Sequence, residues 1–284
     1  MRGAVRRFFD FVERRLGRLA EHRLRLALSA AGFVGSLRNR LSRRWPSPRE
    51  IGALFPLLGP REAAKAAWKI GGIEARNRIF AAHLEEDDAR LAQELMSRPF
   101  PDLARLRPPF IVGSFHVGAL QALRAALIWL PAPVLVLRLG YRTPTLPTHT
   151  VLAVGETAQQ RAALFARALA HLRSGGVVVL ALDYVTGPAF RVPFLGRSLE
   201  LARGPFAMAR LAGAPLWPVA VRWRGGAVDI EVGDELTADR SSCPEACEEE
   251  MAMAAARWLE KYLRSDPGET GLGLLHRLVL PREA

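Results

Sequence analysis

From residue 110 onward, short apolar runs alternate with segments in which apolar residues recur at helical spacing. The apolar runs predict strands over 110–115, 134–137, 151–154, 177–182, 216–223 and 227–232. The periodic segments, and two more ahead of the first strand, predict helices over 60–84, 85–96, 118–130, 158–172, 202–211 and 244–263. Because strands that alternate with helices indicate βαβ units, we expect an α/β fold with a mixed, mostly parallel sheet flanked by helices. Gly225 and Gly226 between the last two strands predict a hairpin, so that edge should be antiparallel.

The N-terminal segment has an amphipathic helical pattern with a basic flank. Its apolar residues recur at helical spacing from Val5 to Leu41, arginines occupy the other sides, and Pro46 ends the pattern. We therefore expect two parts, a basic amphipathic arm over 1–45 and an α/β domain over 46–284. Two interpretations of the arm are open, because such a helix either docks on anionic lipid or packs on its own domain.

Charge separates the arm from the rest of the chain. The 284 residues carry a net charge of +12, of which residues 1–50 contribute +9. A basic arm on a nearly neutral body is typical of a protein that meets an anionic surface at one end. Of the 40 basic residues only three are lysine, which reflects either a GC-rich genome or the use of arginine for bidentate phosphate contacts. With 50% hydrophobic residues, the body can bury a sizeable core.

Two features bear on the cellular compartment. The first 23 residues are densely charged and lack a secretory-signal pattern, and the uncharged stretch 26–37 is about half the ~20 residues that a membrane span needs. Cys243 and Cys247 have no second cysteine or histidine pair, which favours free thiols over a zinc site or a disulfide framework. We therefore expect a protein inside the cell that contacts a membrane without crossing it.

The first predicted strand ends on a candidate base. The run P-F-I-V-G-S-F-H-V-G breaks at glycines and delivers His116 to the start of a helical pattern. At a helix N-terminus the partial positive charge disfavours imidazolium, which keeps the ring neutral and able to accept a proton. The alternative is a histidine whose ring is satisfied by a backbone carbonyl.

Five ordered blocks carry a family resemblance. They are H-V-G-A-L-Q at 116–121, V-L-V-L-R at 134–138, G-G-V-V-V-L-A-L-D-Y at 175–184, V-P-F-L-G-R at 192–197 and G-P-F-A-M-A-R-L-A-G-A-P-L-W-P-V at 204–219. In this order they resemble the motifs of the bacterial lipid A biosynthesis acyltransferases of the lauroyl/myristoyl type, within the lysophospholipid acyltransferase superfamily. Each block alone is a weak signal, and their order makes the resemblance specific.

The resemblance implies a fold, a reaction and a location. The fold would be glycerolphosphate-acyltransferase-like, and the reaction would move a fatty acyl chain from acyl carrier protein or coenzyme A to a hydroxyl of a lipid A precursor or related phospholipid. His116 would be the general base. No metal or bound cofactor is implied. The protein would lie peripherally on the cytoplasmic face of the inner membrane, held by its arm.

The partner of His116 is the point at which the chain departs from the family. The family motif has an acid five residues after the histidine, where this chain has Gln121. An amide oxygen can accept a hydrogen bond from Nδ1 but cannot supply the charge that stabilises imidazolium. Another acid, Glu156 or Asp183, is an alternative partner. A catalytically impaired lipid-binding protein is therefore the alternative function.

The resemblance implies roles for four further residues. Arg138 and Asp183 would position a phosphate or carrier arm and brace the site at strand ends. Arg197 would contact a phosphorylated headgroup in a bidentate manner, and Phe194 in the same block would belong to the substrate-binding region. Each of the three charged residues also has a structural alternative. These are an exposed strand-end charge for Arg138, a loop cap for Asp183 and a solvated side chain for Arg197.

Other function classes have less support. Gly113 and Ser114, beside His116, could offer donors to a developing oxyanion. Ser114 is not in a G-x-S-x-G elbow, which argues against a serine hydrolase. Neither a P-loop nor a G-x-G-x-x-G fingerprint is present, so nucleotide binding has no support. The arginines of the arm are not interleaved with aromatic stacking positions, which argues against nucleic-acid binding.

Overall fold

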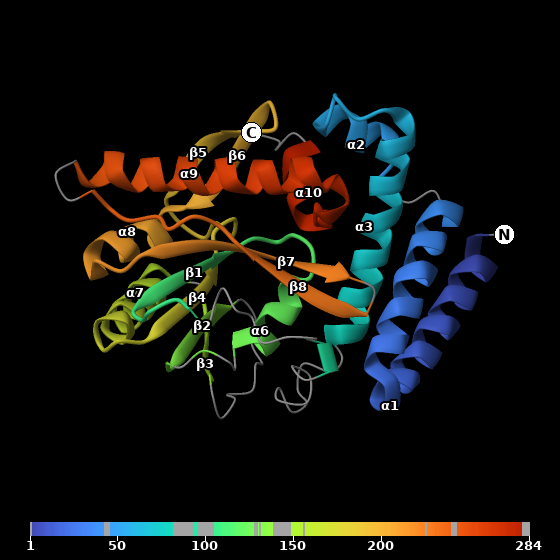
Figure 1. The fold of residues 1–284 in the computed structure, drawn as a ribbon, viewed down its shortest axis with the longest axis horizontal. Helices are drawn as coiled ribbons and strands as arrows, with labels where there is room; N and C mark the ends of the chain where they lie inside the picture. The colour runs from blue at the N-terminus through green and yellow to red at the C-terminus, as the bar shows by residue number, and fades with distance from the viewer. Residues whose placement is uncertain are drawn as a thin grey trace.

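The computed structural model describes residues 2–42, 46–81, 94–95, 105–127, 130, 132–138, 149–155, 157–224, 226–239 and 243–279. Within these residues the centre is a six-stranded sheet in the order β3-β2-β4-β1-β7-β8 (Figure 1). Its strands are β1 (Phe110–Ser114), β2 (Val134–Arg138), β3 (His149–Ala153), β4 (Val177–Ala181), β7 (Leu216–Arg224) and β8 (Ala227–Val232). Neighbours from β3 to β7 pair in parallel, and β8 pairs antiparallel with β7. The expected α/β class, the mostly parallel sheet and the antiparallel edge are therefore confirmed.

Helices cover both faces of this sheet, as a parallel sheet requires. Those described are α1 (Arg2–Ser42), α2 (Pro48–Leu54), α3 (Pro60–Ala81), α6 (Leu123–Ala126), α7 (Ala158–Arg173), α8 (Arg203–Ala212), α9 (Pro244–Ser265) and α10 (Leu272–Val279). Two short 3₁₀ turns, η1 and η3, span Leu120–Ala122 and Pro267–Glu269. The predicted helices over 60–84, 158–172, 202–211 and 244–263 are thus confirmed to within a few residues at their ends.

Alternation along the strands divides the interior into two cores. Ile111, Val178 and Leu216 point to one face and pack with residues of α7, α8, α9 and α10. Their neighbours on the other face pack with α1, α3 and α6. Because β1 and β4, at the centre of the parallel part, are covered on both faces, their residues form continuous apolar runs in the sequence.

The N-terminal helix α1 is two helices joined at Arg23, where the backbone leaves helical geometry. The two halves lie side by side, with the first half on the outside and α3 on the inside (Figure 1). Arg38 Nη2 lies 2.9 Å from Asp10 Oδ1, which links the halves. Leu24 and Leu28 of the second half are fully buried in the core that includes α3. The second half of α1 therefore packs against the rest of the protein. The predicted boundary at residue 45 lies outside the described residues.

No described helix combines the length and apolar character that crossing a bilayer requires. This agrees with the short uncharged stretch noted in the sequence.

The helix predicted over 118–130 starts at Leu120 in the structure, and residues 128 and 129 lie outside the described residues. Gly118 adopts φ 52°, and the Ala119 amide donates to the carbonyl of Val221 at 2.6 Å. The chain after His116 is therefore tied to β7 as a turn, and helical structure begins at Leu120. His116 therefore lies in a turn ahead of the first helical residue, and the expectation that it lies at a helix N-terminus was wrong. The helix predicted over 85–96 lies almost entirely outside the described residues.

Among the described elements, the helix α2, a hairpin of two strands, the turn η3 and the helix α10 had no counterpart in the sequence prediction. β5 (Ala189–Phe194) and β6 (Arg197–Ala202) form a separate antiparallel hairpin. Its two-residue turn places Leu195 at φ 50° and Gly196 at φ 70°, the positive values that tight hairpins use. The C-terminal helix α10 packs its leucines into the core that also contains α9.

Candidate active site

Parallel pairing of β1 with β4 brings His116 and Asp183 together. In the register of these strands, Ser114 lies opposite Ala181. His116 follows Ser114 by two residues, and Asp183 follows Ala181 by two residues. Both side chains therefore leave the sheet at the same carboxyl edge, where open α/β sheets place their sites.

The ring of His116 is paired with the carboxylate of Asp183. His116 Nδ1 lies 2.8 Å from Asp183 Oδ1, and the His116 backbone amide donates to both carboxylate oxygens at 3.1 and 3.2 Å. An ionised carboxylate accepts but cannot donate, so Nδ1 carries the hydrogen and Nε2 keeps a lone pair. The ring is 38% exposed, whereas Asp183 is fully buried. The pair thus presents a basic nitrogen at the surface of a pocket.

The charge of Asp183 is maintained by three groups around it. Burial alone would raise its pKa, but the hydrogen bond from the His116 ring, the charges of His116 and Arg277, and the His116 amide hold the pKa of Asp183 below its usual value. Arg277 of α10 donates to the backbone carbonyl of Asp183 through Nη1 and to Oδ2 through Nη2. An ionised Asp183 is the form that can stabilise an imidazolium on His116.

The family motif suggested Gln121 as the partner of His116, but in the structure the partner is Asp183. Nδ1 of His116 is occupied by Asp183, the acid that the sequence left as an alternative. Gln121 lies in the 3₁₀ turn η1 and lines the pocket instead. The reason is the turn after His116, which delays the start of helical structure to Leu120. Glu156, the other alternative acid, lies outside the described residues.

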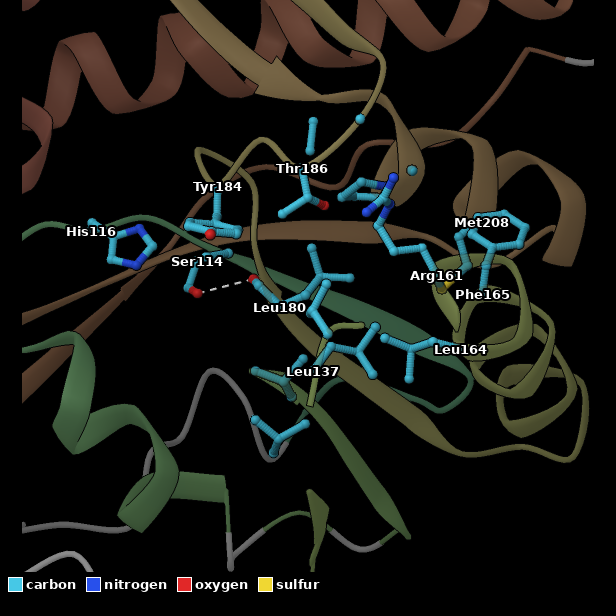
Figure 2. Close-up of a pocket in the computed structure, with 18 of the residues that line it drawn as sticks. Ser114, His116, Leu137, Arg161, Leu164, Phe165, Leu180, Tyr184, Thr186 and Met208 are labelled. Atoms are coloured by element: carbon cyan, nitrogen blue, oxygen red, sulfur yellow. Dashed lines mark hydrogen bonds between the residues drawn. The ribbon is translucent and has the colours of Figure 1, made fainter. Parts of the chain in front are cut away.

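An apolar pocket of about 510 Å³ opens beside His116. Figure 2 shows His116, Ser114 and Tyr184 at one end and Leu164, Phe165 and Met208 at the other. The walls come from the ends of β2 and β4, one side of α7, and the first turns of α8. Leu137 and Leu180 line the floor between the two ends (Figure 2). A largely apolar pocket with a basic nitrogen at one end suits an alkyl chain whose reactive carbonyl lies at His116.

The structure places Gly113 and Ser114 inside β1, between β4 and β7. The Ser114 hydroxyl donates to the Leu180 carbonyl at 2.9 Å and is therefore engaged within the sheet. Because β1 is paired on both sides, these two residues do not project amides into the pocket as oxyanion donors would. Arg138 is the last residue of β2, and its role remains a prediction.

Phe194 and Arg197 lie in the β5–β6 hairpin and are not among the residues that line the pocket. Phe194 is 1% exposed and belongs to the core, which corrects its assignment to substrate binding. Arg197 Nη1 donates to the Leu278 carbonyl at 2.9 Å, near the C-terminal end of α10. This arginine therefore holds a helix end in the structure, and a contact with a phosphorylated headgroup stays a prediction.

Residues of three other elements form hydrogen bonds that hold the turn carrying His116, and these contacts were not predicted from the sequence. Asn77 Nδ2 of α3 donates to the Gly118 carbonyl at 2.9 Å, and its Oδ1 accepts from Trp223 Nε1. The Gly118 amide donates to the Glu269 carbonyl at 2.9 Å. Asn77 is an ordinary polar residue in a helical pattern, so nothing in the sequence marked it. Gly118 had a signal, since a glycine directly after a strand end often supplies positive φ.

Comparison with known proteins adds little beyond these observations. No family model matches the chain, and no curated protein matches it. Among solved structures, the 1-acyl-sn-glycerophosphate (LPA) acyltransferase PlsC from Thermotoga maritima has a TM-score of 0.38 and 12% identity, over 85% of this chain and 97% of that chain. A likeness at this level carries no functional argument. The fold and site define an α/β protein with a His–Asp pair at the end of an apolar pocket.

Proposed function

We propose that this protein is an acyltransferase that moves a fatty acyl chain from an acyl thioester to a lipid hydroxyl. The observation that carries the proposal is the His116–Asp183 pair at the end of the apolar pocket. The donor would be acyl carrier protein or coenzyme A, and the acceptor a lipid A precursor or related phospholipid. The choice of acceptor rests on the five ordered sequence motifs between residues 116 and 219.

The proposed reaction needs only the two substrates. His116 Nε2 takes the proton of the acceptor hydroxyl while the oxygen attacks the thioester carbonyl carbon. The tetrahedral intermediate collapses, the C–S bond breaks, and the leaving thiolate receives the proton from His116. Asp183 stabilises the imidazolium that exists between these steps. The products are an ester and a free thiol.

The pairing with Asp183 weakens the alternative of an inactive lipid-binding protein. That alternative rested on Gln121, which cannot supply a negative charge. Asp183 supplies the charge from the neighbouring strand, so the absence of an acid at position 121 is no longer a reason to expect impairment.

We also propose that α1 holds the protein on the cytoplasmic face of an anionic membrane. Three phenylalanines of the helix are largely exposed: Phe8 at 60%, Phe11 at 48% and Phe33 at 62%. Arg15 lies over the Phe11 ring at 5.2 Å, so a cation and an apolar ring share one surface. Exposed aromatic rings beside arginines suit the boundary between headgroups and acyl chains, where apolar insertion and charge attraction add.

The test of catalysis compares the wild type with His116→Ala in transfer from an acyl-carrier-protein thioester, and from acyl-coenzyme A, to lipid acceptors. Removal of a general base should lower kcat by about 10²- to 10⁴-fold. His171→Ala is the matched control, since this ring contacts the Pro133 carbonyl at 3.0 Å, outside the apolar pocket. Equal rates for wild type and His116→Ala would refute the proposed function.

A further inference from the structure

The C-terminal segment 266–279 contacts the candidate active site at several points. Gly118 lies two residues after His116, and its amide donates to the Glu269 carbonyl. Gly271 lies so close to the His116 carbonyl that a Cβ at this position would be 2.1 Å from its oxygen. Arg277 reaches Asp183. A segment that begins about 150 residues after His116 therefore forms one wall behind the His–Asp pair.

Arg277 makes a two-pronged contact with Asp183. Nη1 donates to the backbone carbonyl and Nη2 to Oδ2, while Oδ1 remains for the His116 ring. The backbone contact fixes the guanidinium relative to the chain at Asp183, and the second contact fixes the rotation of the carboxylate. The charge of Arg277 also offsets the cost of placing an ionised carboxylate in a fully buried position.

Arg197 fastens the helix that carries Arg277. Its Nη1 donates to the Leu278 carbonyl, one residue after Arg277. Leu274 and Leu275 of α10 are fully buried in the core shared with α9. The guanidinium of Arg277 is thus delivered by a helix that is fixed on its apolar side by packing and at its end by the β5–β6 hairpin.

We propose that Arg277 is a positioning residue, which holds the Asp183 carboxylate ionised and aimed at His116 Nδ1, and that Arg197 serves the site by fixing the end of α10. The proposal rests on the proposed acyltransferase function for its effect on turnover. Arg277 acts through Asp183 and does not line the pocket. It should therefore influence the rate of the chemical step and leave substrate binding unchanged.

Other charged and titratable groups face this pair. The Tyr184 ring lies 6.2 Å from the His116 ring, centroid to centroid. Behind the turn, Glu269 is fully buried, with Lys69 Nζ 2.6 Å from Oε1, and Lys69 also pairs with Asp266. Burial raises the pKa of Glu269. These groups stay in place in the variants below, so a change seen on removing Arg277 reports on the Asp183 contact.

The kinetic test uses Arg277→Gln and Arg277→Lys in the full chain. By analogy with other residues that orient a catalytic side chain, we expect Arg277→Gln to lower kcat by about 10- to 100-fold and to leave KM within about twofold. Arg277→Lys keeps a charge near Oδ2 and should lose less. Arg264→Gln is the matched control, because Arg264 also bonds a carboxylate, Glu260, but on the exposed side of α9.

A double-mutant cycle separates positioning from a general loss of stability. In the background of Asp183→Asn, the further change Arg277→Gln should cost little, because the charged carboxylate that Arg277 positions is no longer present. A loss of equal size in both backgrounds would overturn the proposal. Arg197→Ala should resemble Arg277→Gln in lowering kcat. An increase in KM alone for Arg197→Ala would refute its anchoring role and favour contact with a phosphorylated substrate.

The second readout needs no substrate. In ¹⁵N-histidine-labelled protein, the Nδ1–H proton of His116 should be visible and protected from exchange in the wild type, because it is bonded to a buried carboxylate. We expect Arg277→Gln to broaden or remove this signal and Arg264→Gln to retain it. A retained signal in Arg277→Gln would refute the proposal. A wild type without transfer activity would refute the proposed function, and the ring signal would still decide the role of Arg277.

Discussion

Replacement of Asp183 by asparagine tests the site most directly, because the structure predicts a specific conflict. Oδ1 accepts from the His116 ring, and Oδ2 accepts from Arg277, so donors face both oxygens. An asparagine has one acceptor and one donor group and can match only one of these partners. If its NH₂ group faces the histidine, Nδ1 becomes the acceptor and Nε2 carries the hydrogen, which removes the base. If it faces Arg277, two donor groups face each other and Nη2 of the guanidinium loses its acceptor.

The size of the effect follows from these alternatives. Loss of the correct tautomer and of the charge that stabilises imidazolium should lower kcat by about 10²- to 10⁴-fold. Leaving one buried donor without an acceptor should reduce the free energy of unfolding by about 1–3 kcal/mol. Both effects are expected together, and the activity loss should greatly exceed what partial unfolding explains.

The pH dependence of stability gives an independent check. The pKa of Asp183 is lowered in the folded state, so its ionised form favours folding. This contribution is fully present above the unfolded value of about 3.8 and is lost as the pH falls through the lower folded value. The stability difference between wild type and Asp183→Asn should therefore shrink on acidification from neutral pH to below pH 4.

The assays are steady-state acyl transfer and urea unfolding at several pH values. Asp229→Asn is the control, since this partly exposed carboxylate on β8 pairs with Arg224 at 3.0 Å, away from the pocket. If the kcat of Asp183→Asn were within about threefold of the wild-type value, the assignment of Asp183 as the partner of the base would be refuted.

Three further predictions follow from other parts of the structure. Gln121→Glu should leave transfer unchanged or lower it, because it adds a carboxylate to a largely apolar pocket while Nδ1 of His116 is already bonded to Asp183. Higher activity in the same assay would contradict this. Gly118→Ala should lower both the melting temperature and kcat, since it forces φ 52° on a residue with a Cβ and places that Cβ 2.1 Å from the Val221 carbonyl oxygen; Gly52→Ala, in open space on α2 and outside the pocket, is the control. Phe8→Ser with Phe11→Ser should weaken sedimentation with anionic vesicles, because the apolar contribution is lost while the arginines remain, and equal binding by wild type and variant would count against docking through α1.

The regular part of the fold was predictable because periodicity is a local property. The β-strands and long helices after residue 110 follow from apolar runs and helical spacing, and their alternation implies parallel pairing. The start of the helix after His116 was predicted two residues too early, since the hydrogen bond between Ala119 and Val221 joins residues about 100 positions apart. The β5–β6 hairpin was missed because V-P-F-L-G-R resembles a loop, and only its pairing reveals two strands.

The sequence by itself determined that a histidine ends the first strand of an α/β sheet, because glycine and apolar spacing fix where that strand stops. It also supplied Asp183 at the end of a second strand, but not the choice between this acid and Gln121 as partner. The tertiary structure decided that choice. The parallel register of β1 and β4 places Asp183 beside the His116 ring, although the two residues are 67 positions apart. Gln121 is only five positions from His116, but the turn between them leaves it on the pocket wall. Arg277 entered the site through the packing of α10, since contacts between distant segments depend on register and packing and leave no local pattern.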